Sequence, residues 1–434
     1  MSTALSAAVE KSLRARAAAN RDALVAAIRD LVRIPSENTP PTGNELACQE
    51  YVAQSLTRMG WKPDLYRPDE APGAAGHPLY WHGRDYRNRP NVGARRRGAG
   101  GGRSLVLSGH IDTVPAGTQP WTRDPFGGEI EGNRLYGRGS NDMKAGVAAN
   151  LFVLRALADL EIELAGDLVF ETVVDEEFGG VNGTLAGRLA GYNGDAAVIS
   201  EPSFLRICAA QRGGRTAHIT LSAPSGGILK EGGAPPGVIE QLRCFLDHLP
   251  EFTQRRRKAA PAHRLYPQPD PVPVSVARIS TGPWGFREPP SNPDTCQIEL
   301  FWQAMPGETV EEVDAQFGAW IEDLVAAEPR LFASRPRVEF PIRWLPGSAI
   351  DPDEPLVREL SACAADVLGK PPAVVGIEGP CDMYVFHQVA GTPAVLWGAR
   401  GGNTHKADEY VELDSAAAAA ETLLLFVCRW CGVR

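Results

Sequence analysis

The sequence predicts an α/β domain whose mainly parallel sheet is flanked by helices, with a smaller α+β domain inserted into it. Two observations lead to this prediction. Short apolar strands alternate with helical stretches in both the first and the last part of the chain, as in parallel α/β sheets. The 434 residues also exceed what one hydrophobic core usually holds. We expect residues 1–207 and 347–434 to form the larger domain and residues 208–346 the inserted one.

The elements of the larger domain are predicted from the spacing of apolar residues and from the segments that interrupt them. Leu24, Ile28, Leu31 and Val32 recur at helical spacing, and residues 34–44 are rich in Pro, Asn and Thr and break that helix. Residues 68–100 are rich in Pro, Gly and Arg and resemble a loop. The expected helices are residues 6–32, 45–59, 143–160 and 415–431, and the expected strands lie within residues 103–112, 167–180, 195–202 and 392–405.

The inserted segment has a different order of elements. It alternates strand and helix, beginning with "TAHITLSA" and ending with "RVEFPIRW". The expected strands are residues 216–223, 295–305 and 337–344, and the expected helices are residues 236–249 and 309–328. This pattern is typical of a compact α+β unit.

Composition excludes several classes of protein. The formal charge is 44 − 53 = −9, whereas a nucleic-acid-binding surface is normally basic. Two short basic clusters, at residues 93–98 and 254–260, are expected to be solvated loops. The sequence shows neither a run of about 18 apolar residues nor a recognisable leader, and its eight cysteines do not suggest a disulfide scaffold. We therefore expect a cytoplasmic protein with no nucleic-acid or membrane partner.

Polar residues cluster where the expected strands end. In open α/β sheets, sites form just beyond the carboxyl ends of the strands. Those ends, together with the loop before the helix at residue 143, carry two histidines and several carboxylates: His110, Asp112, Asp142, Asp175, Glu176, Glu177, Glu201 and His405. Taken singly, each has an ordinary structural explanation, such as a helix cap at Asp142 or a packed imidazole at His110. Their joint placement indicates a metal site.

The mixture of ligand types limits which metal ions the site is expected to bind. Imidazole with carboxylate and no thiolate suits Zn²⁺, Mn²⁺ or Co²⁺. Five ligands, namely His110, Asp142, Glu201, His405 and one of the two adjacent glutamates, are enough for two ions that share one carboxylate. Asp142 is the natural bridge because it has two oxygens. Two such ions hold a water and lower its pKa, and the other glutamate of the Glu176–Glu177 pair then serves as general base. Asp112 is placed to orient His110.

Five motifs together resemble one family of enzymes. They are "SGHIDTVPAG", "YGRGSNDMKAG", "VVDEEFGG", "ISEP" and "GGNTHKADEYV", spanning residues 108–411. They resemble the dinuclear metallohydrolase family of acetylornithine deacetylase, succinyl-diaminopimelate desuccinylase and the aminoacylases. "GRDYRNRPNVGA" also looks like the deacetylase branch.

The resemblance assigns a role to each residue of the site. It implies that His110, Asp142 and Glu201 hold one ion, and that Asp142, Glu177 and His405 hold the other. It implies Glu176 as general base and Asp112 as the residue behind His110. The inserted domain would be the lid and the surface through which a homodimer forms.

The chain departs from the family pattern in the inserted domain. The family's lid usually carries an oxyanion-stabilising histidine, and Gly227 occupies that place. His218 lies nine positions earlier, within the expected strand, where a packed or hydrogen-bonded imidazole is as good an explanation as a catalytic one. The family's lid arginine before a "PGE" turn is replaced by Gln303. Phe301, Trp302 and Met305 adjoin it, and packing within a strand explains these three residues as well as contact with a substrate does. Asn292 matches a lid asparagine, and Arg264 and Arg287 are nearby cations that offer a substitute for the arginine. We expect Asn292, Gln303, His218 and Arg287 to contact substrate.

Three functions remain open from the sequence. The leading hypothesis is hydrolysis of a C–N bond in a small N-acyl amino acid. The alternative is attack on an activated aromatic amine with release of ammonia, as in a nitroanthranilate-type aminohydrolase of the same family. The altered lid and the aromatic residues around Trp302 motivate this alternative, because attack on a ring needs no oxyanion donor. The third hypothesis is a non-catalytic binding protein on this fold, which the complete ligand set disfavours.

Overall fold

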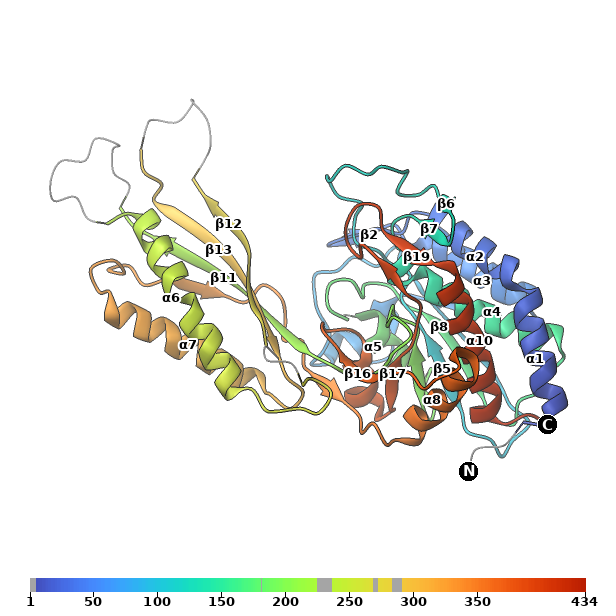
Figure 1. Cartoon of the computed structure of the whole chain (residues 1–434). Coiled ribbons are helices and arrows are strands. Elements are labelled where there is room, and N and C mark those ends of the chain that lie inside the picture. Colours follow the sequence, from blue (N-terminus) through green and yellow to red (C-terminus); the bar gives the residue numbers. More distant parts are fainter. Residues whose placement is uncertain (1–4, 181, 225–235, 268–271, 283–290) are drawn as a thin grey trace. The chain divides into compact units, whose positions relative to one another are not determined.

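The computed structural model describes residues 5–180, 182–224, 236–267, 272–282 and 291–434. These residues form two compact units, both drawn in Figure 1. Unit 1 comprises Met1–Ala210, Ala349–Ile377 and Cys381–Arg434, and unit 2 comprises Gln211–Ser348 and Glu378–Pro380.

Unit 1 is built on a nine-stranded mixed sheet with a parallel centre. The strand order is β15–β10–β17–β9–β5–β8–β4–β3, and β16 pairs with β10. The four central strands β17, β9, β5 and β8 are parallel, whereas β4, β3 and β10 are antiparallel to their neighbours. The strands are β3 (Asp64–Tyr66), β4 (Asn91–Arg96), β5 (Leu105–Ser108), β8 (Leu168–Thr172), β9 (Ala197–Ile199), β10 (Ile207–Gln211), β15 (Ser348–Ala349), β16 (Val374–Ile377) and β17 (Ala394–Leu396).

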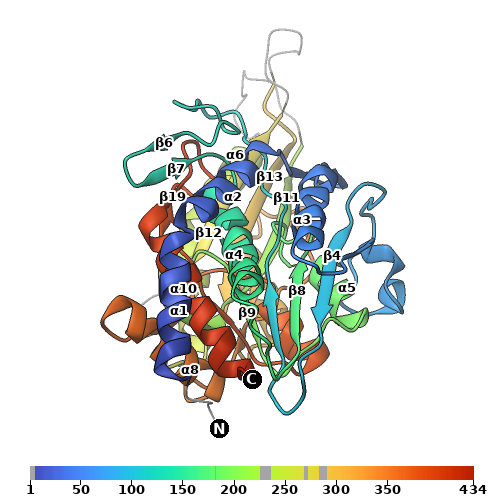
Figure 2. The same cartoon turned by 90° about the vertical axis from the view of Figure 1, so that its right-hand side faces the viewer.

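Helices cover both faces of this sheet, which confirms the predicted fold class (Figures 1 and 2). The central strands are apolar along their whole length because both faces are buried; Leu105, Val106 and Leu107 are all fully buried. The single helix expected over residues 6–32 is divided at Asn20, a residue type that favours helix ends. The helices are α1 (Ala7–Ala19), α2 (Arg21–Arg33), α3 (Leu46–Arg58), α4 (Ala145–Asp159), α5 (Asn182–Leu189), α8 (Pro355–Leu368), α9 (Met383–Val385) and α10 (Leu413–Cys431).

A second, small sheet brings two distant loops together. Its order is β18–β19–β7–β6, formed by Gly401–Gly402, Tyr410–Glu412, Arg134–Tyr136 and Ile130–Glu131. In this sheet Tyr410 pairs with Tyr136 in antiparallel register. The pairing holds the loop that carries His405 beside the turn η3 (Ser140–Lys144) that carries Asp142.

Unit 2 is a four-stranded antiparallel sheet with two helices. Its order is β12–β13–β11–β14, formed by Val274–Thr281, Thr295–Ala304, Gly213–Ser222 and Arg337–Glu339. The helices are α6 (Val238–Ala259) and α7 (Val310–Ala327). Trp302 is fully buried, stacked on Phe317 and edge-on to Phe252, so this residue belongs to the core of unit 2.

The structure corrects one expectation about charge. Both basic clusters were expected to be solvated loops, but Arg95 and Arg96 lie in β4, and most of the second cluster is the last part of α6. There Arg256 is fully buried and pairs with Glu308 at 2.7 Å, whereas Arg257 and Lys258 of the same helix are exposed. Among the described residues, none of the helices has the length and apolar character needed to cross a membrane.

Candidate metal centre

The parallel strands of unit 1 deliver the site residues to one edge. Since β8, β5, β9 and β17 are parallel neighbours, their carboxyl ends meet at the same rim of the sheet. His110 follows β5, Glu176 and Glu177 follow β8, and Glu201 follows β9. Asp142 comes from η3 and His405 from the loop between β18 and β19.

The side chains converge on Asp142. His110 Nε2 lies 3.1 Å from Asp142 Oδ1, and His405 Nε2 lies 3.3 Å from Asp142 Oδ2. His110 Nε2 is also 3.5 Å from Glu201 Oε1, and His405 Nε2 is 2.8 Å from Glu177 Oε2. Each oxygen of Asp142 thus faces a different histidine, and each of these histidines contacts a different glutamate. This arrangement suits two cations that share Asp142.

The charge of the cluster supports the same interpretation. Burial raises the pKa of Glu176, Glu177 and Glu201, and repulsion from neighbouring carboxylates raises each of them further. Ionised carboxylates in such a dry cluster are stabilised by a cation. The donor atoms of His110, Asp142 and Glu177, and those of His110, Glu176 and Glu201, lie within 4.8 Å of one another. The donor set therefore fits divalent metal ions chemically and spatially.

Asp112 is fully buried behind His110. The Asp112 backbone carbonyl lies 2.9 Å from His110 Nδ1, and its carboxylate Oδ1 lies 3.6 Å from the same nitrogen. The carboxylate also accepts the backbone N–H groups of Glu176 and Glu177, each at 3.2 Å, and the amide of Asn38 at 2.9 Å. The Asp112 carbonyl is thus within hydrogen-bond distance of the imidazole, and the Asp112 carboxylate binds the glutamate turn.

Glu409 is a part of the site that the sequence analysis missed. It is fully buried, and its Oε1 accepts the backbone N–H groups of Asn141 at 3.0 Å and Asp142 at 3.1 Å. Its Oε2 accepts Gly139 N–H at 3.1 Å and Arg138 Nη1 at 2.6 Å. The sequence feature that could have identified Glu409 is its position four residues after His405, in "HKADE". Glu409 shapes the turn that presents Asp142.

Asp382 is a second missed carboxylate. It is buried, and it accepts a hydrogen bond from the Thr184 hydroxyl. Burial raises its pKa to about 7, and its charge in turn raises the pKa of Glu176 and Glu201. Nothing in the sequence around residue 382 resembles a metal motif, so only the fold places this carboxylate near the cluster.

The residues expected to contact substrate lie in unit 2, where other groups occupy most of them. His218 Nε2 lies 3.0 Å from Glu299 Oε2 on the neighbouring strand. Gln303 accepts a hydrogen bond from Arg212 at 2.5 Å and donates one to the Glu378 carbonyl. Asn292 is half-buried just before β13, and Arg264 is exposed. Gly227 and Arg287 lie outside the described residues.

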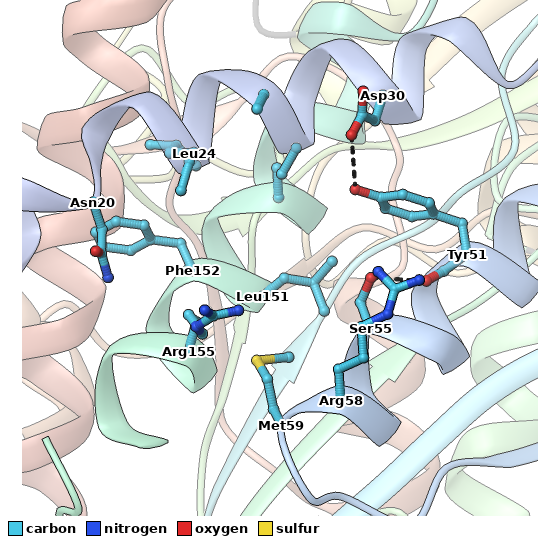
Figure 3. A pocket seen from close by; sticks show the side chains of 14 residues that line it. Asn20, Leu24, Asp30, Tyr51, Ser55, Arg58, Met59, Leu151, Phe152 and Arg155 are labelled. Carbon is cyan, nitrogen blue, oxygen red and sulfur yellow. Dashed lines mark hydrogen bonds between the residues drawn. The ribbon is translucent and has the colours of Figure 1, made fainter. Parts of the chain in front are cut away.

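A pocket of about 250 Å³ elsewhere in unit 1 contains none of the predicted site residues. It is lined by α2, α3 and α4, with Leu24, Leu151 and Phe152 among its apolar walls (Figure 3). The Tyr51 hydroxyl donates to Asp30 Oδ2 across it at 3.4 Å. It has no cluster of histidines and carboxylates.

Comparison with known proteins identifies relatives of the whole chain. The model of peptidase family M20/M25/M40 matches residues 106–429. N-formyl-4-amino-5-aminomethyl-2-methylpyrimidine deformylase of Halalkalibacterium halodurans is 27% identical over 98% of both chains. Acetylornithine deacetylase of Edwardsiella ictaluri is 27% identical over 80% of this chain and 84% of its own. Among solved structures, a di-peptidase from Saccharomyces cerevisiae superposes with a TM-score of 0.76 at 14% identity, covering 97% of this chain and 98% of that one, which shows a shared fold.

Proposed function

The chain belongs to peptidase family M20/M25/M40, and from this premise we propose that it removes a small acyl group from an N-acyl amino acid. It is a metal-dependent hydrolase of C–N bonds. The observation that carries the proposal is the division of contacts between two adjacent glutamates. Glu177 Oε2 contacts His405 and its Oε1 accepts Val114 N–H at 3.1 Å, whereas Glu176 Oε2 lies 3.8 Å from His110.

These contacts suggest different roles for the two glutamates, a metal ligand for one and a general base for the other. Glu177 is held on both oxygens, so it is placed to bind a cation. Glu176 is held through its backbone by Asp112, and its buried carboxylate has a raised pKa, which suits a group that must take up a proton. In the proposed reaction, Glu176 takes the proton of the attacking water and then passes it to the leaving nitrogen.

The metal ions would be held by the cluster around Asp142. We propose His110, Asp142 and Glu201 for one ion, and Asp142, Glu177 and His405 for the other. The donors are nitrogen and carboxylate oxygen, which Zn²⁺, Mn²⁺ and Co²⁺ all accept. Bound divalent ions supply Lewis acidity toward the carbonyl and acidify water.

The relatives support a small acyl group. The names of the relatives described above include a formyl and an acetyl group, and the deformylase matches almost the full length of both chains. The alternative of aromatic-amine hydrolysis gains no support from them. Its structural motivation is also weaker, because Trp302 lies in the core of unit 2 and does not line a substrate site.

Product analysis tests the proposal directly. Protein loaded with Zn²⁺ or Mn²⁺ is incubated with N-formyl, N-acetyl and N-succinyl amino acids, with dipeptides and with an electron-poor aminobenzoate, and the products are identified by mass spectrometry. Release of free amino acid and a short carboxylic acid, absent in Glu176→Gln, supports the proposal. Cleavage of dipeptides alone, or ammonia from the aminobenzoate alone, would contradict it.

We also propose a homodimer that forms through unit 2. Strand β12 is an edge of its sheet and is largely exposed, with Ile279 at 42% exposure. An exposed edge strand with an apolar side chain is a surface for pairing with a second chain across a two-fold axis. Sedimentation velocity of the wild type and of Ile279→Lys measures the oligomeric state. A monomeric wild type would refute the proposed homodimer.

A further inference from the structure

The loop before β4 lies against the glutamate turn of the metal centre. The Trp81 N–H donates to Asn182 Oδ1, and Asn182 Nδ2 donates to the Trp81 carbonyl, both at 2.8 Å. The Tyr86 hydroxyl donates to Asp175 Oδ2 at 2.6 Å. Asp175 directly precedes Glu176, and Asn182 begins α5 after the same turn. Residues 81–86 are thus held at both ends against the segment that carries the proposed base.

Arg84 is the cation within this loop. Its side chain is only 5% exposed, and its guanidinium lies 4.3 Å from the centre of the Trp81 ring and 5.6 Å from that of Phe178. Phe178 is the residue directly after Glu177. Two aromatic rings therefore hold the guanidinium beside the turn that carries a metal ligand and the base.

The Arg84 guanidinium has N–H donors that make no hydrogen bond with the described residues of the protein. Its Nε is buried without a hydrogen bond and lies 3.4 Å from Asp175 Oδ2. Within the part of the chain that the structure describes, its terminal Nη groups donate to no protein acceptor. Asp175 is already occupied, because it accepts hydrogen bonds from Tyr86 at 2.6 Å and from Asn38 at 2.9 Å. Arg84 therefore offers Asp175 only its Nε, as a counter-charge at 3.4 Å, and its Nη groups are not used by that carboxylate.

Arg89 belongs to the same network and is an arginine with a structural role, so its contacts can be compared with those of Arg84. Its side chain is 1% exposed, and it donates to both oxygens of Glu45 at 2.7–2.9 Å. Arg84 has a similarly buried side chain but no such acceptor. The Arg84 guanidinium lies against two rings and pairs with Asp175 only through Nε, so its two Nη groups are placed for two parallel hydrogen bonds to an incoming carboxylate.

We propose that Arg84 recognises the carboxylate of the substrate, which makes the substrates N-acyl amino acids that retain a free carboxylate. This inference rests on the proposed deacylase function. Gln303 stands in unit 2 where a lid arginine was expected, and Arg84 supplies that cation from the unit that holds the metal ligands. Trp81 and Phe178 keep the guanidinium in place through their rings.

The test compares a substrate with its uncharged counterpart. We would measure kcat/KM of zinc-loaded protein for N-acetyl-L-methionine and N-acetyl-L-methioninamide, and for the matching N-formyl pair. Arg84→Gln should lower kcat/KM about 100-fold for the acids, since a bidentate charged pair is lost, and change it less than about 3-fold for the amides. Arg84→Lys keeps the charge and stem and should recover part of the loss. Arg87→Gln is the matched control, because Arg87 lies in the same loop with 82% of its side chain exposed.

The outcomes are distinguishable. An equal loss for acids and amides in Arg84→Gln and Arg84→Lys, or a wild type that does not prefer the acids, would overturn the inference. If the wild type hydrolyses neither member of either pair, the deacylase proposal fails. Calorimetric titration of N-acetylmethionine and its amide into the wild type and Arg84→Lys then decides the role of Arg84. Stronger binding of the acid that depends on Arg84 supports carboxylate recognition, and equal binding refutes it.

Discussion

Replacing Glu409 by glutamine removes the charge that shapes the Asp142 turn. The carboxylate accepts four hydrogen bonds, from Arg138 at 2.6 Å and from the N–H groups of Gly139, Asn141 and Asp142 at 3.0–3.1 Å. A glutamine amide keeps one acceptor oxygen and places an NH₂ group where two donors already point. The substitution therefore breaks two hydrogen bonds and leaves a buried guanidinium without its counter-charge.

The energetic cost follows from the burial of this ion pair. Breaking a buried ion pair by removing one partner costs about 3–5 kcal/mol. Here both partners are nearly fully buried, with exposed fractions of 2% and 1% for Arg138 and Glu409, so solvent cannot compensate. Because the same carboxylate aligns Asp142, we expect metal affinity to fall by about 10–100-fold, as is usual when a residue that orients a ligand is changed.

Two measurements test this prediction. Competition with a chelator gives the metal affinity, and hydrogen exchange of the peptide covering residues 138–146 reports the backbone N–H groups that Glu409 binds. Glu409→Asp keeps the charge and should lie between wild type and Glu409→Gln. Glu412→Gln is the control, since Glu412 is part-exposed and ends β19, the strand that begins directly after Glu409. If Glu409→Gln binds metal and exchanges like wild type, the assignment of Glu409 is wrong.

Three further predictions concern the base, the metal and pH. Glu176→Gln should bind metal normally and lose about 10²–10⁴-fold in kcat, measured by amino acid release; retained turnover would exclude it as base. Chelation should lower the melting temperature, because the buried carboxylates then lose their counter-ions. Adding Zn²⁺ or Mn²⁺ at about 100 times its Kd should raise the free energy of unfolding by about 3 kcal/mol, and identical melting with and without metal would refute this prediction. Burial lowers the pKa of His387 to about 4 from 6.5, and its Nε2 accepts Ala394 N–H at 3.2 Å. Between these pH values the unfolded imidazole binds a proton that the folded one does not, so stability should fall by about 3 kcal/mol as pH drops from 6.5 to 4. Denaturant titrations of His387→Gln should show a smaller fall with pH than wild type, and equal slopes would contradict the assignment.

The local sequence was sufficient to locate the candidate metal centre. Apolar strands are recognisable from neighbouring residues, and parallel strands bring their carboxyl ends to one rim, so His110, Glu176, Glu177 and Glu201 were predictable as neighbours. Asp142 and His405 were expected to join them from the loop before a helix and the loop after the last strand, and the resemblance to the family gave both residues their ligand roles. What the sequence determined was therefore the fold class and the chemistry of the cluster.

Tertiary structure decided what surrounds that cluster. Glu409 and Arg138 are 271 positions apart, and Arg84 meets Asp175 only because the loop before β4 is held against the turn after β8. In the sequence, Trp302 was explained equally well as a substrate-facing aromatic residue and as a packed strand residue, and the structure shows the second, because its side of β13 faces the helices of unit 2. Such contacts depend on how distant segments pack, and a strand pattern identifies buried positions without specifying their partners. The residues around the proposed metal ligands, and Arg84, for which we propose a role in substrate selection, are assembled by packing across the chain.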